Sequence, residues 1–123
     1  MSTPPIAEVL IVEDEYITRM VAADALVDEG IGVQEAGDAA EALEVLAHHP
    51  EVGLLFTDIN LPGDMDGLAL TAKVHRMRPD VELVVTSGGT LVANGDLPDH
   101  GTFVPKPYNT AKLISLVRAK LGS

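Results

Sequence analysis

Cysteine is absent from the 123-residue chain, which excludes disulfides, thiolate nucleophiles and sulfur-ligated zinc or iron–sulfur centres. Aromatic side chains are also scarce, at 3% of residues against 46% for all hydrophobic types. The core must therefore consist mainly of Val, Leu, Ile and Ala side chains. A chain of this length can bury enough of them for one domain, so we expect a single domain over residues 1–123 with a loose tail at 1–5.

Basic residues are few, with 8 Lys and Arg against 19 Asp and Glu, and the net charge is −11. A surface of that sign repels phosphate backbones and anionic membranes, so we expect neither nucleic acid nor membrane as a partner. No run of 18 apolar residues occurs, and the first residues, MSTPPIAEVL, lack the pattern of a secretion signal. We expect a soluble, unprocessed protein of the cytoplasm.

Short apolar runs recur along the chain, and they are continuous rather than alternating. Continuous runs are typical of strands that are covered on both faces, as in a parallel sheet. The four clear runs cover residues 8–12, 53–58, 81–86 and 101–105, and a weaker run covers 32–37.

Helical patterns separate these runs. The first has an apolar stripe that ends before Gly30, a residue typical of helix C-termini. The second begins after Asp38, and Glu41 three residues later completes a capping box. The stripe of the first helix consists of Ile17, Val21, Ala22, Ala25 and Leu26.

Two further helices are predicted near Asp66 and from Thr110. Residues 87–101 should hold another, but four glycines and a proline interrupt the pattern there, so we expect it to be short or irregular. The side chains expected to point inward are Leu70, Val74 and Met77 in the helix near Asp66, and Leu113, Val117 and Leu121 in the last.

Strands that alternate with helices most simply form an open parallel sheet with helices on both faces. We therefore expect an α/β fold with a doubly wound, five-stranded parallel sheet. Such sheets place their sites at the carboxyl ends of the strands, next to the point where the strand order reverses. In the order 2-1-3-4-5, the ends of the first, third, fourth and fifth strands could share one pocket.

Polar side chains follow four of the five strands. They are Glu13, Asp14 and Glu15, then Asp58, then Thr86 and Ser87, and finally Lys106. Three crowded carboxylates repel one another and favour a cation, and Mg²⁺ prefers oxygen ligands of this kind. Zinc is less favoured because no histidine lies at these ends. His48 and His49 are neighbours on a helix end and point in different directions, so we expect no metal site from them.

These groups suit phosphoryl transfer. A carboxylate oxygen of Asp58 could attack phosphorus while Mg²⁺ and Lys106 neutralise charge on the phosphoryl oxygens. The hydroxyl of Thr86 could donate a hydrogen bond to one of those oxygens. This chemistry would explain why an aspartate ends a buried strand.

Four motifs in the order VEDE, DINLPGDMDG, TS and KP resemble those of the receiver domain of bacterial two-component response regulators. The resemblance covers essentially the whole chain and implies a flavodoxin-like fold. It implies that Asp58 accepts a phosphoryl group from a phosphohistidine of a sensor histidine kinase or histidine phosphotransfer protein. Lys106 would pair with that group, and the bond between Lys106 and Pro107 would be cis.

The resemblance also implies roles for five other residues. Asp14 would bind Mg²⁺ directly, Glu13 would bind it through water, and Asn60 would offer its backbone carbonyl. Thr86 would follow the phosphoryl group, and Phe103 takes the position of an aromatic switch residue that turns inward when the threonine moves. Phe103 has no hydroxyl, so a switch that needs a tyrosine hydrogen bond is excluded.

We expect a stand-alone receiver that acts through protein contacts on an unknown target. It would catalyse its own phosphorylation and dephosphorylation without being a turnover enzyme. One alternative is an interaction module of the same fold that signals without phosphorylation. Another is a Mg²⁺-dependent phosphatase with an aspartyl nucleophile, but those enzymes resemble this chain less because Asn60 takes the place of their second aspartate.

Overall fold

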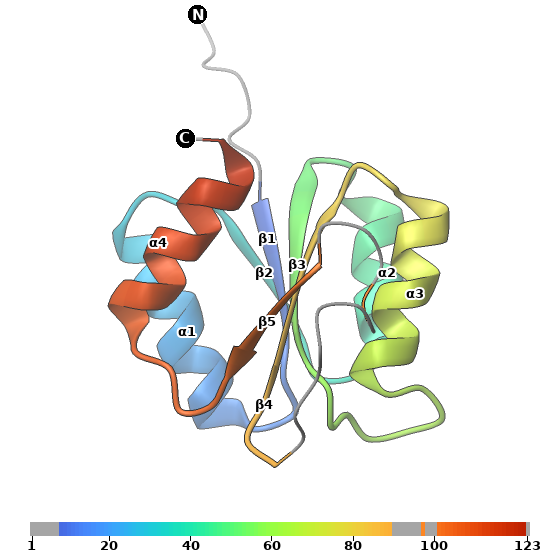
Figure 1. Cartoon of the computed structure of the whole chain (residues 1–123). Coiled ribbons are helices and arrows are strands. Elements are labelled where there is room, and N and C mark those ends of the chain that lie inside the picture. The colour runs from blue at the N-terminus through green and yellow to red at the C-terminus, as the bar shows by residue number, and fades with distance from the viewer. Residues whose placement is uncertain (1–7, 90–96, 98–100, 123) are drawn as a thin grey trace, which may run out of the picture.

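The computed structural model describes residues 8–89, 97 and 101–122 and consists of five strands and four helices in those ranges. Figure 1 shows the sheet edge-on between two layers of helices. In chain order the elements are β1 Glu8–Val12, α1 Tyr16–Asp28, β2 Val33–Ala36, α2 Ala39–His48, β3 Val52–Asp58, α3 Gly67–Met77, β4 Glu82–Ser87, β5 Thr102–Pro105 and α4 Thr110–Leu121.

The five strands form one parallel sheet in the order β2-β1-β3-β4-β5, which confirms the predicted α/β topology. β1 and β3 are neighbours although α1, β2 and α2 lie between them in the chain. Their carboxyl ends therefore meet at one edge of the sheet, where Val12 pairs with Thr57 and Asp58 pairs with Thr86.

Successive side chains of each strand enter different cores, because side chains alternate between the two faces of a sheet. Val9 and Ile11 pack with α1 and α4, whereas Leu10 and Val12 pack with α2 and α3. In Figure 1, α1 and α4 lie on one side of the sheet and α2 and α3 on the other. This double coverage explains the continuous apolar runs, and it leaves the strand ends as the place for polar groups.

The predicted helix ends are largely confirmed. The side chains of Asp38 and Asp66 each accept a hydrogen bond from a backbone N–H of the first turn, at 2.8 Å. Gly30 follows α1 with φ +80, a conformation that favours glycine. The capping box differs in one bond, since Glu41 accepts from the N–H of Gly37 at 2.6 Å rather than from that of Asp38.

Three side chains expected to face inward are exposed. Met77 is 51% exposed because it lies in the last turn of α3, beyond the buried Val74. Ile17 and Val21 are 61% and 50% exposed, although Ala22 and Leu26 on the same stripe are buried. The amino-terminal part of the α1 stripe therefore faces a surface pocket rather than the sheet.

Leu121 of α4, the other residue expected inward at a helix end, is half-buried and packs against the core next to α1. The helix expected within residues 87–101 falls mostly on 90–96 and 98–100, which lie outside the described residues, as does the tail at 1–5. No helix in the described ranges is long and apolar enough to cross a bilayer.

Candidate functional site

The carboxyl edge of the sheet brings together three acids and one lysine from three separate segments. Glu13 and Asp14 follow β1, Asp58 ends β3, and Lys106 follows β5. A carboxylate oxygen from each of the three acids lies within 4.8 Å of the other two. The structure thus assembles the acids that the sequence placed at these strand ends.

Asp58 is buried, with 6% of its surface exposed, and both of its carboxylate oxygens have partners. Oδ1 accepts a hydrogen bond from the backbone N–H of Asn60 at 2.9 Å, and Oδ2 accepts one from Nζ of Lys106 at 2.8 Å. The side chain of Asn60 lies 3.4 Å from Oγ of Ser87. These contacts fix the direction of the Asp58 carboxylate at the end of its strand.

Lys106 joins Asp58 to Glu13, since its ammonium also lies 2.9 Å from Oε1 of Glu13. Burial lowers the pKa of Lys106, but the hydrogen bonds to Asp58 and Glu13 outweigh that effect and the pKa is raised above its ordinary value. The side chain therefore remains an ammonium at neutral pH. The peptide bond to Pro107 is cis, as the resemblance implied.

Glu13 and Asp14 differ in burial although they are adjacent. Glu13 is 5% exposed, and burial raises the pKa of its carboxyl against the opposing effects of Lys106 and of the backbone N–H of Glu15. That N–H donates to Oε2 of Glu13 at 3.1 Å, so both oxygens of Glu13 are occupied. Asp14 is exposed, and its carboxylate accepts no hydrogen bond within the described residues.

This donor set fits Mg²⁺. The three carboxylates carry three negative charges against the single positive charge of Lys106, so a dication would balance the group. All of the available donor atoms are oxygens, which suits a hard cation. The carboxylate of Asp14 is the one best placed for direct contact, whereas Glu13 and Asp58 already accept hydrogen bonds at both oxygens.

Thr86 and Ser87 lie at the end of β4, next to Asp58 in the sheet register. Thr86 is 2% exposed, and its hydroxyl is the one buried side-chain polar atom without a hydrogen-bond partner in the described part of the chain. An unpaired buried hydroxyl costs free energy, so its presence calls for a specific explanation. Ser87 accepts from the N–H of Gly89 at 3.3 Å.

Phe103 lies in β5, opposite Val85 of β4. It is half-buried and packs against a small apolar cluster that contains Ile59, Val85 and Leu97. Val104, rather than Phe103, is the residue of β5 in register with Thr86. The side chain is thus a neighbour of the Thr86 strand without being part of the acidic group.

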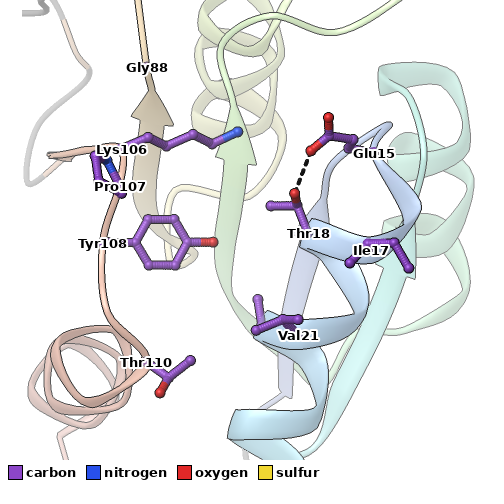
Figure 2. A pocket seen from close by; sticks show the side chains of 10 residues that line it. Glu15, Ile17, Thr18, Val21, Gly88, Lys106, Pro107, Tyr108 and Thr110 are labelled. Carbon is purple, nitrogen blue, oxygen red and sulfur yellow. Dashed lines mark hydrogen bonds between the residues drawn. The ribbon is translucent and has the colours of Figure 1, made fainter.

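A pocket of about 530 Å³ lies beside Lys106, between α1 and the segment that follows β5. Figure 2 shows Tyr108 pointing across it toward α1, where Ile17 and Val21 line the opposite wall. The ring of Tyr108 packs edge-on against Phe56 at 5.5 Å between centroids. The pocket therefore has an apolar wall that starts directly next to the acidic site.

Two residues that hold the site were not singled out from the sequence. The guanidinium of Arg19 donates to the backbone carbonyl of Glu13 at 2.7 Å and pairs with Glu35 at 3.1 Å. Gly67 leaves no room for a side chain, since a Cβ there would lie 2.0 Å from the backbone oxygen of Asp58. Gly67 is the last residue of the DINLPGDMDG motif, so the motif could have identified it. No motif or pattern in the sequence identifies Arg19.

The sequences of curated relatives align with nearly the whole length of this chain. The chain is 34% identical over 119 residues to the sensor kinase CckA of Brucella abortus, covering 94% of this chain and 12% of that protein. It is 34% identical over 115 residues to a protein of Rickettsia bellii described as an NtrX-like response regulator, covering 90% of this chain and 24% of that protein. The chain thus spans a quarter or less of these relatives.

The fold agrees with the same group of proteins. The crystal structure of the NtrX receiver domain from Brucella abortus superposes with a TM-score of 0.85 at 31% identity, covering 94% of this chain and 99% of that one. Residues 9–118 match the family described as response regulator receiver domain. The chain therefore belongs to the receiver domain family of two-component response regulators, whose members act as signalling switches rather than as turnover enzymes.

Proposed function

We propose that this receiver domain is a phosphorylation switch in which Asp58 accepts a phosphoryl group in the presence of Mg²⁺. The observation that carries the proposal is the 2.8 Å contact between Nζ of Lys106, which follows β5, and Oδ2 of Asp58, which ends β3. A lysine that only neutralised a surface acid would not need to reach a carboxylate that is 6% exposed. The phosphatase alternative is disfavoured because Asn60 occupies the position of the second aspartate.

The donor would be a phosphohistidine on a sensor histidine kinase or histidine phosphotransfer protein. A carboxylate oxygen of Asp58 attacks the phosphorus, a P–O bond forms, the P–N bond breaks, and the leaving imidazole keeps the electron pair and takes up a proton. Bound Mg²⁺ would supply charge neutralisation for the phosphoryl oxygens. Asp14 and Asp58 would hold it through their carboxylates and Asn60 through its backbone carbonyl, with Glu13 acting through water.

Lys106 and Thr86 act on the same phosphoryl group. The Lys106 ammonium would move from Asp58 to a phosphoryl oxygen, where negative charge now lies. The hydroxyl of Thr86, which has no hydrogen-bond partner among the described residues of the unphosphorylated protein, would donate to an oxygen of the phosphoryl group. Movement of Thr86 would then leave space that the half-buried Phe103 could occupy, which makes Phe103 the residue that transmits the change.

The pocket next to Lys106 is part of the same proposal. A partner that carries phosphohistidine must approach Asp58 from the open side of the strand ends, where Ile17 and Val21 are exposed. Exposed apolar side chains rimmed by polar ones are common in protein interfaces. We also propose a cytoplasmic location, in agreement with a sequence free of cysteine.

Intact mass measurement after incubation with acetyl phosphate and Mg²⁺ tests the proposal. Wild-type protein should gain the mass of one phosphoryl group, and Asp58→Asn should gain none. Asp64→Asn is the matched control, because Asp64 is an exposed aspartate of the neighbouring loop. This variant should gain one phosphoryl group, as the wild type does. No mass gain in the wild type would instead favour the interaction module that signals without phosphorylation.

A further inference from the structure

Three potential metal ligands meet at the amino-terminal edge of the sheet, away from the acidic site. Glu8 begins β1, while His49 and Glu51 belong to the turn between α2 and β3. One ligand atom from each side chain lies within 4.8 Å of the other two, and all three residues are half-buried. The imidazole distinguishes this group from an ordinary cluster of surface acids.

The contacts of the group leave its charge incompletely balanced. His49 Nδ1 lies 2.9 Å from Oε2 of Glu51, and the amide of Gln34 donates to Oε1 of Glu8 at 3.2 Å. Among the ion pairs of the described residues, the cluster makes only that between His49 and Glu51, and the imidazole is charged only when it is protonated. Two nearby carboxylates therefore share at most one positive charge from this histidine.

The backbone beside Glu8 is shaped to admit its side chain. A Cβ on Gly32 would lie 2.8 Å from Cγ and 3.0 Å from Oε2 of Glu8. Glycine at this position therefore leaves room for the Glu8 side chain where it lies, next to His49 and Glu51. A larger residue at position 32 would make this flexible side chain shift.

We propose that Glu8, His49 and Glu51 form a second metal site that takes Zn²⁺ or a similar borderline dication. One imidazole nitrogen and two carboxylate oxygens are ligands that zinc accepts, with water in the fourth position. A tetrahedral ion with bonds of about 2.1 Å places its ligands about 3.4 Å apart, so small side-chain rotations would close the site. A dication with a neutral imidazole would balance both carboxylates.

The site is independent of the proposed phosphorylation. It lies at the start of β1 and β3, whereas Asp58 ends β3, and five residues of β1 span roughly 16 Å. Its three ligands come from β1 and from the turn before β3, so a bound ion would link the two segments. Binding to the folded state alone would raise the thermal unfolding temperature.

Calorimetric titration with ZnCl₂ tests the site in Asp14→Ala/Asp58→Asn protein, which lacks the two carboxylates that would bind an ion directly at the acidic site. One zinc equivalent should bind. Loss of a ligand in His49→Ala, Glu51→Gln or Glu8→Gln should weaken binding by more than about 100-fold, since even residues behind the ligands contribute roughly 10- to 100-fold. His48→Ala is the matched control, because Nδ1 of that histidine contacts the carbonyl of Glu44 instead.

Circular dichroism of each variant confirms that it remains folded, and the two glutamine variants preserve side-chain size. Binding that is lost in the three ligand variants and kept in His48→Ala supports the site. Absence of zinc binding in the parent protein overturns it. So does binding that survives unchanged in His49→Ala or in Glu51→Gln.

Discussion

Nζ of Lys106 lies 2.8 Å from Oδ2 of Asp58, although the two residues are 48 positions apart in the chain. The contact depends on the crossover topology, which places β4 between β3 and β5 so that Lys106 must extend over the end of β4. Glu13 accepts from the same ammonium, so one lysine holds together three segments of the domain. Replacement of Lys106 should therefore change both the free energy of unfolding and the rate of phosphorylation, and the two effects can be measured separately.

Lys106→Met should lower the free energy of unfolding by about 1–3 kcal/mol, because it leaves the buried carboxylates of Glu13 and Asp58 without their cation. Mg²⁺ should restore part of that loss by binding the same acids. Phosphorylation by acetyl phosphate should slow by about 100-fold or more even at saturating Mg²⁺. Urea unfolding with and without Mg²⁺ and the time course of intact mass measure the two effects.

Lys112→Met is the matched control for this variant. Lys112 is an exposed residue near the start of α4, so its loss should change neither quantity. If Lys106→Met were phosphorylated at the wild-type rate, the lysine would have a structural role only.

Thr86→Val should stabilise the unphosphorylated protein by about 1 kcal/mol, because valine fills the same space without burying an unpaired hydroxyl. The same substitution should reduce the rate of phosphorylation, since the phosphoryl group would lose a donor. Chemical denaturation and the mass assay on one preparation measure both outcomes, which have opposite signs.

Thr57→Val provides the comparison. Thr57 is equally buried on the neighbouring strand, but its hydroxyl donates to the carbonyl of Asp58 at 2.9 Å. Its replacement should therefore destabilise the protein by about 1 kcal/mol. Equal destabilisation in both variants would contradict the view that the Thr86 hydroxyl lacks a partner.

Much of the fold and the position of the site follow from the sequence because each depends on local patterns. Continuous apolar runs identify strands covered on both faces, and a parallel sheet brings the residues after those strands to one edge. Asp58 and Lys106 could thus be expected near each other without any knowledge of their rotamers. Local patterns also predicted the helix cap at Asp38, since capping involves residues three positions apart, and the start of a helix near Asp66.

The features that the sequence did not predict depend on contacts between distant segments. The stripe of α1 gives no indication that Ile17 and Val21 extend past the sheet to a pocket formed with Tyr108. Helical spacing correctly separates His48 from His49, but it cannot show that the fold brings Glu8 next to His49. Arg19 likewise looks like any surface arginine until the structure places it on the carbonyl of Glu13.

Gly67→Ala should destabilise the protein by about 2–4 kcal/mol, because the new Cβ would lie 2.0 Å from the backbone oxygen of Asp58 and the backbone cannot yield as a flexible side chain would. Gly63→Ala, in the loop that precedes α3, is a useful control. Its φ of +95 strains alanine by about 1–2 kcal/mol, but nothing lies within 4 Å of the new Cβ. Thermal unfolding that ranks the two variants in the reverse order would contradict the close approach at Gly67.

Tyr108 gives the domain a pH dependence in the alkaline range. Burial raises the pKa of its phenol above the ordinary value of 10.0. The folded state therefore holds the proton more tightly than the unfolded chain, and this contribution to stability is fully present below pH 10 and is lost as pH rises through the folded-state pKa. The chain has two tyrosines, so Tyr16→Phe leaves Tyr108 as the one phenol that titrates.

Ultraviolet absorbance of Tyr16→Phe should show phenol ionisation at a higher pH in the folded protein than in denaturant. Addition of Tyr108→Phe should remove that signal and make unfolding free energy fall less steeply above pH 10, because the group whose ionisation opposes folding is gone. The difference between the two proteins isolates Tyr108 from Lys106, whose raised pKa acts in the same direction in both. Coincident ionisation midpoints in the folded and unfolded states would mean that the phenol is open to solvent, and that the wall of the pocket next to the acidic site is not packed against Phe56.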